Sequence, residues 1–165
     1  MRGTATYEMR GNAGFSLIEL LMVLAVLAVL AALTAPSMRA FMDSQIVKTP
    51  ASDLYASLVL ARSEAIKRNS AVDLVPGGAD WAAGWQVRAG TTVLRVQEGY
   101  PRISIAASSA GTVTYGGNGR LSTSASTFRV LVPGNPEARM RCVSVSVSGR
   151  PNVRVDSNTD QAACD

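Results

Sequence analysis

The chain lacks the residues and motifs on which most enzymes depend. Histidine, the commonest general base and metal ligand, is absent from its 165 residues. There is no glycine-rich phosphate loop, no Cys-x-x-Cys pair and no nucleophile elbow. The acids Asp53, Glu64 and Asp73 are scattered along segments where solvated side chains are the simplest interpretation. We therefore expect no catalytic residues, no metal site and no cofactor.

Cysteine is also scarce, because Cys142 and Cys164 are the only two. Such a pair is usually a disulfide in an oxidising compartment, whereas in a reducing one both thiols stay free. The bond would close a loop of about 20 residues and contribute about 3 kcal/mol in the chain-entropy model. We expect the disulfide, because it would anchor a C-terminal tail that would otherwise fray.

The excess of basic residues is small. The formal net charge is +4, which by itself does not indicate a nucleic-acid-binding protein. A local cluster of arginines nevertheless lies toward the C-terminus and could bind DNA phosphates, or could simply be a solvated basic face. Its members are Arg139, Arg141, Arg150 and Arg154.

One long apolar run, GFSLIELLMVLAVLAVLAALTA, covers residues 14–35. As a helix, residues 15–35 would be about 31 Å long, enough to cross the hydrocarbon core of a bilayer. A membrane anchor fits the run, and so does a secretory signal with a cut near Ala35. Neither explains Glu19, since a carboxylate inside a bilayer costs several kcal/mol unless it is paired. A cut between Gly14 and Phe15 would create an amine four residues before this acid.

The motif GFSLIEL, with the apolar run behind it and Pro36 at its end, resembles the class III signal of type IV pilins and type II secretion pseudopilins. The resemblance implies that a prepilin peptidase cuts after Gly14 and N-methylates Phe15. It also implies that Glu19 acts in assembly. Residues 1–14 would then be a cleaved leader.

A helix followed by strands is predicted beyond the leader. Residues 15–35 are expected to be the transmembrane and assembly helix, and residues 36–69 its amphipathic continuation, kinked or interrupted at Pro36 and Pro50. An apolar stripe at helical spacing predicts the face that packs in the core. The stripe consists of Ala51, Leu54, Leu58, Ala61 and Ala65.

Residues 70–165 are expected to form a β-rich globular domain in the periplasm. The whole chain thus predicts an α+β, pilin-like fold, with a long N-terminal helix packed on an antiparallel β-sheet. The predicted strands are Ala71–Val75, Gly84–Ala89, Thr92–Gln97, Ile103–Ala106, Thr112–Tyr115, Phe128–Val132, Arg141–Ser148 and Asn152–Val155.

Three later segments resemble the GspH/FimT branch of minor pilins: ARSEAIKRNSAV, DWAAGW and RCVSVSVSGR. The resemblance implies a structural subunit, at the tip or initiating assembly, of a type IV pilus or a type II secretion pseudopilus. It would cross the inner membrane once before entering the filament. Implied partners are other pilins or pseudopilins, prepilin peptidase and the inner-membrane assembly platform. Branch members that bind DNA for uptake tend to carry Gly-Arg-x-Arg, whereas GRPNVR here displaces the second arginine to Arg154.

Overall fold

The computed structural model describes residues 15–164 except 79, 110, 136–137 and 157–161. The chain forms two compact units, Met1–Met38 and Arg39–Asp165, which we call the amino-terminal unit and the globular unit. One α-helix, α1 (Leu17–Arg68), contributes residues to both.

Helix α1 continues through both prolines, so the interruption expected at Pro36 or Pro50 is wrong, whereas the alternative expectation of a kink stays a prediction. An interior proline removes one backbone hydrogen bond and clashes with the preceding turn, at a cost of about 3 kcal/mol. At Pro50 the surrounding packing offsets this cost, because Pro50 is buried and its neighbours Val47 and Ala51 are fully buried. Tertiary burial of a helix face commonly outweighs local propensity in this way.

Apolar side chains cover the part of α1 that belongs to the amino-terminal unit. Between Leu17 and Leu30 the large apolar residues are 50–76% exposed. No described residue of the unit covers them, which indicates a surface that meets lipid or other apolar protein surfaces. Among the residues whose side chains are described, which exclude 33–37, no helix is both long and apolar enough to cross a membrane. The span predicted for residues 15–35 therefore stays a prediction.

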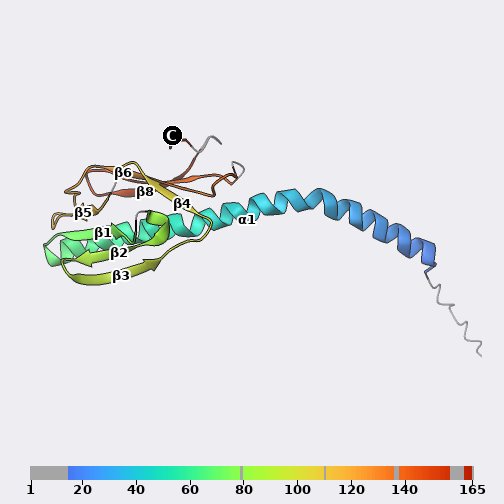
Figure 1. The fold of residues 1–165 in the computed structure, drawn as a ribbon, viewed down its shortest axis with the longest axis horizontal. Helices are drawn as coiled ribbons and strands as arrows, with labels where there is room; N and C mark the ends of the chain where they lie inside the picture. Colours follow the sequence, from blue (N-terminus) through green and yellow to red (C-terminus); the bar gives the residue numbers. More distant parts are fainter. Residues whose placement is uncertain (1–14, 79, 110, 136–137, 157–161, 165) are drawn as a thin grey trace, which may run out of the picture. The chain divides into compact units, whose positions relative to one another are not determined.

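In the globular unit, two four-stranded antiparallel sheets lie along α1 (Figure 1). The first has the order β3 (Thr92–Glu98), β2 (Gly84–Ala89), β1 (Val72–Pro76) and β5 (Val113–Tyr115). The second has the order β4 (Ser104–Ala107), β6 (Ser126–Leu131), β7 (Arg141–Val145) and β8 (Pro151–Val155). A short 3-10 turn, η1 (Trp81–Ala83), precedes β2.

All the predicted strands are present, and the α+β class is confirmed. The largest difference is β7, which ends at Val145 instead of Ser148. The chain turns there, because the Gly149 amide donates to the Ser146 carbonyl (2.8 Å). Gly149 has a φ of 78°, a conformation that residues with a side chain rarely adopt.

One hydrophobic core joins α1 to the inner faces of both sheets. The predicted helix stripe is fully buried within it, from Ala51 to Ala65. Trp81 and Trp85 are 4% and 1% exposed, so both belong to the core. The ring of Trp81 contacts Phe128 of β6 edge-on, with centroids 4.9 Å apart, and so connects η1 to the second sheet.

Candidate functional site

The predicted processing site falls at the edge of the described residues. Gly14 lies outside them, and Phe15 precedes α1 with its side chain 81% exposed. Cleavage after Gly14 and methylation of Phe15 therefore stay predictions.

Ser16 and Glu19 together begin the helix. The Glu19 amide donates to Ser16 Oγ (3.3 Å), and the Leu20 amide donates to the Ser16 carbonyl (3.2 Å). This is half of the capping box that a Ser-x-x-Glu spacing favours. The Glu19 carboxylate also lies in the first turn, where the helix dipole stabilises negative charge. The capping role of Ser16 was not predicted, although the Ser-x-x-Glu spacing is a usable signal for it.

A second group of polar residues joins α1 to the first sheet. Tyr100 Oη donates to Asp53 Oδ2 (2.5 Å) and accepts from Gln97 Nε2 (2.9 Å). Partial burial raises the pKa of the Tyr100 phenol far above its ordinary value, and the hydrogen bond to the Asp53 carboxylate raises that pKa further. Asp53 is thus a bonded residue, not the solvated acid we expected.

Next to this pair, Trp85 is tied to the same helix. Its Nε1–H donates to Ser57 Oγ (2.9 Å), and that hydroxyl donates to the Asp53 carbonyl (2.8 Å). Trp85 also contacts the Tyr100 ring, with centroids 5.9 Å apart. Because a buried indole N–H needs an acceptor, this chain of bonds fixes the position of β2 along α1.

Both ends of the globular part of α1 carry further contacts. Asp43 accepts from Asn135 Nδ2 (2.6 Å) and forms an ion pair with Arg102 (3.4 Å). Near the other end, Arg62 Nε donates to the Gly119 carbonyl (3.1 Å). The helix is therefore held to loops of the globular unit at two levels outside the central polar group.

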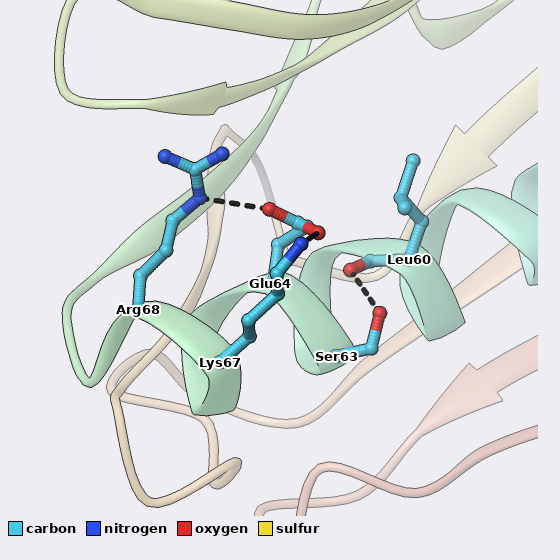
Figure 2. Close-up of polar contacts among 5 residues, drawn as sticks. All are labelled: Leu60, Ser63, Glu64, Lys67 and Arg68. Carbon is cyan, nitrogen blue, oxygen red and sulfur yellow. Dashed lines mark hydrogen bonds and ion pairs between the residues drawn. The ribbon is translucent and has the colours of Figure 1, made fainter.

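Glu64 forms ion pairs in the last turns of α1, so it is not the solvated acid we expected. Arg68 Nε lies 2.8 Å from Glu64 Oε2, and Lys67 Nζ lies 3.5 Å from Oε1, as Figure 2 shows. The hydrogen bond from Arg68 lowers the pKa of the Glu64 carboxyl. Ser63 Oγ donates to the Leu60 carbonyl on the same stretch (2.9 Å).

The four arginines of the predicted basic cluster do not form one patch. Arg154 and Arg141 lie on opposite faces of the second sheet, because Arg154 pairs with Cys142 and Arg141 pairs with Val155. Arg150 precedes β8, at the opposite end of that strand from Arg154. Arg139 is exposed in the loop before β7.

The structure instead brings a different arginine beside Arg154. Cys142 pairs with Arg129 of β6 on one side and with Arg154 of β8 on the other, and cross-strand partners share a face. Sequence analysis missed Arg129. The sequence signal is the alternation in STFRVL, where Arg129 stands between the apolar Phe128 and Val130, and burial along β6 alternates in the same way.

The predicted disulfide is confirmed. Cys142 and Cys164 are bonded, with Cα atoms 5.9 Å apart and a sequence separation of 22 residues. The bond holds Ala162–Cys164 against the outer face of the second sheet, where the Arg129 guanidinium donates to the Ala162 carbonyl. Within the part of the chain that the structure describes, no group of three His, Cys, Asp or Glu residues could hold a metal ion.

Comparisons with known proteins agree with this architecture. The family profile described as Type II transport protein GspH matches residues 51–149, more than half of the chain. The profile described as Prokaryotic N-terminal methylation motif matches residues 9–35. No curated protein matches the chain in sequence.

Solved structures show the same fold. The type IV minor pilin FimU of Pseudomonas aeruginosa is 23% identical in one crystal form, with a TM-score of 0.61, covering 72% of this chain and 98% of FimU. A second crystal form of FimU gives 24% identity and a TM-score of 0.59, covering 68% and 98%. The minor pseudopilin EpsH from the type II secretion system of Vibrio cholerae is 14% identical, with a TM-score of 0.53, covering 66% and 96%. The chain belongs to the GspH family of minor pilins and pseudopilins, a family of structural subunits, and it carries the N-terminal methylation motif.

Proposed function

We propose that the chain is a minor subunit, at the tip or initiating assembly, of a type IV pilus or a type II secretion pseudopilus. It is inserted once in the inner membrane with its globular unit in the periplasm, is cut between Gly14 and Phe15, and is N-methylated on Phe15. Prepilin peptidase and the assembly platform are its processing and assembly partners. The main observation behind this proposal is that the first part of α1 exposes an apolar surface with one acid, Glu19, in its first turn.

The exposed apolar surface has no cover among the described residues, and we infer that its partner lies outside the chain. Burying one large apolar side chain contributes about 1.5–3 kcal/mol, and such residues follow one another from Leu17 to Leu30. Lipid satisfies them before assembly, and the matching helices of other pilins satisfy them in a filament. The same surface then serves in both places, which is what a subunit that leaves the membrane for a filament needs.

Glu19 supplies the polar element of this surface. Its backbone amide is used in the cap with Ser16, whereas no described residue forms a hydrogen bond or ion pair with its carboxylate. A carboxylate in apolar surroundings is strongly destabilising until an opposite charge neutralises it. The new amine of Phe15 on a neighbouring subunit is such a charge. The pair would set the axial stagger between subunits.

The test separates processing from assembly. Mass spectrometry of the membrane-extracted protein should give a chain that starts at N-methylated Phe15, and Gly14→Ala should block this cut. Glu19→Ala should be inserted and cleaved but should be lost from sheared filaments. Ser16→Ala is the matched control, because it removes the cap yet keeps the carboxylate, so it should still assemble. A mature chain starting near Pro36, or normal incorporation of Glu19→Ala, would contradict the proposal.

DNA capture for uptake is the second candidate, and it stays a prediction. It is favoured only by two arginines, Arg129 and Arg154, on one face of the second sheet. The globular unit would bind duplexes of unrelated sequence, and binding would weaken steeply with salt. Replacing Arg129 and Arg154 together should lower the salt slope by about two units. A mobility-shift titration at low salt that shows no complex would leave assembly as the supported function.

A further inference from the structure

A small pocket with both polar and apolar lining lies on the outer face of the second sheet, beside the C-terminal tail. Its volume is about 340 Å³, and its wall combines three sheet-side residues with the tail held by the disulfide. The lining residues are Ser108, Thr127, Arg129, Ala162, Ala163 and Cys164. A volume of this size is at the low end of ligand pockets and suits one small group.

The pocket contains hydrogen-bond donors whose capacity is not used. A guanidinium has five N–H donors, and that of Arg129 donates to the Ala162 carbonyl, a neutral acceptor. Ser108 Oγ accepts from the Thr127 amide (2.9 Å), which leaves the hydroxyl hydrogen of Ser108 able to donate.

The positive charge of Arg129 has no neutralising partner among the described residues. Among the described residues, no carboxylate lies within ion-pair distance of its guanidinium. The strand residues that share its face include Arg154 but no acid. Since Arg129 is also half-buried, its charge is screened less than that of a fully exposed side chain.

We propose that this pocket binds a single oxyanion group, a phosphate or a carboxylate, with Arg129 as its principal donor and Ser108 as the second. The planar fork of a guanidinium matches both groups. Because Cys164 and its neighbours form one wall, the site exists only while the Cys142–Cys164 bond is intact. The proposal is independent of the role of α1 in filament assembly.

The test uses the full chain, ¹⁵N-labelled and held in detergent micelles. Inorganic phosphate and, separately, acetate are titrated against a sodium chloride control of equal ionic strength, while the amide signals of Ser108 and Thr127 are followed. We expect saturable shifts with at least one of the two anions and none with chloride. Saturation with phosphate alone, with acetate alone or with both would identify the source of the oxyanion, and each of these results supports the site.

Variants of Arg129 and Arg154 distinguish binding in the pocket from binding by general surface charge. Arg129→Gln should weaken binding about tenfold or more, because a charge-assisted bond is lost. Arg154→Gln removes the same charge from the same face but lines no part of the pocket, so it should change the affinity by less than about threefold. Arg129→Lys, which keeps the charge and loses the fork, gives the same comparison if Arg129→Gln does not fold, and it should also weaken binding more than Arg154→Gln does.

Reduction of the disulfide should abolish the saturable shifts, and so should Cys142→Ser combined with Cys164→Ser. Tryptophan fluorescence shows whether each sample keeps its core, because Trp81 and Trp85 are the only tryptophans and both are buried. Three results would overturn the proposal: no saturable shift with either anion, equal weakening in the Arg129 and Arg154 variants, or undiminished binding by the folded, reduced protein.

Discussion

Removing the hydroxyl of Tyr100 should measurably loosen the first sheet from α1. Tyr100→Phe deletes the hydrogen bond to the Asp53 carboxylate and leaves Gln97 Nε2 without its acceptor. A hydrogen bond to a charged group contributes about 1.5–3 kcal/mol. Water can reach both half-buried partners, so we expect a loss of about 1.5 kcal/mol in the free energy of unfolding.

A double-mutant cycle with Asp53→Asn isolates this interaction. The two single losses should not add, and the coupling free energy should be about 1 kcal/mol. The free energy of unfolding of wild type and of each variant is measured by guanidinium unfolding of the full chain in micelles. The fluorescence of the two core tryptophans reports the unfolding. Tyr55→Phe is the control, because Tyr55 is 39% exposed on the same helix and should change stability by less than about 0.5 kcal/mol.

The raised pKa of Tyr100 gives the same prediction a pH dependence. The fold favours the neutral phenol, so its contribution is complete below the unfolded-state pKa near 10 and is lost as the pH rises above it. Stability should then fall by about 1.4 kcal/mol per pH unit for each such tyrosine. Tyr115, whose pKa burial raises to about 12, contributes to wild type and variant alike. Additive single losses, or an alkaline slope unchanged in Tyr100→Phe, would refute the reasoning.

Three further predictions concern the rest of the globular unit. Reduction of the disulfide should lower the free energy of unfolding by about 3 kcal/mol, and an unchanged melting temperature with reductant would contradict this. A chain that begins at Arg39 should be more stable than one that begins at Thr49, by about 1.5–3 kcal/mol for Val47 alone, because Val47 is fully buried; equal chemical denaturation midpoints would count against it. Glu64 should titrate below its ordinary pKa of 4.5, so that its contribution to stability is lost as the pH falls through the lowered value. Arg68→Gln should raise that pKa in an NMR titration, and an unmoved value would show that the hydrogen bond is not its cause.

Local patterns were enough to predict the elements of the fold. The helix stripe from Ala51 to Ala65 and the positions of the strands follow from periodicity over a few residues. The division into two sheets could not be predicted this way, because strand pairing joins segments far apart in the chain. The continuity of α1 through Pro50 was missed for a similar reason, since burial of Val47 and Ala51 comes from distant partners.

The candidate sites, too, could be predicted only where the signal lies within a short stretch of sequence. GFSLIEL and the cysteine pair could be read directly, but the arginines could not be assigned to one surface by their nearness in sequence. Arg141 and Arg154 lie on neighbouring strands, yet a register offset of one residue puts them on opposite faces. Arg129 reaches the same face as Arg154 only because β6 and β8 both pair with β7.

The contacts along α1 explain how the globular unit can be carried by a helix that has other partners. Asp43, Ser57 and Arg62 are bonded to three separate parts of the unit, so the domain can neither slide along nor rotate around this part of the helix without breaking several of them. The sheets leave Tyr55, Val59 and Ile66 exposed by 39–51%, and helical spacing places these three within a narrow arc. Neighbouring subunits in a filament can therefore pack on this arc without displacing the sheets. A partner bound to this arc fixes the rotation of α1 about its own axis. It thereby also fixes which sheet faces outward and the direction in which the Arg129 pocket opens.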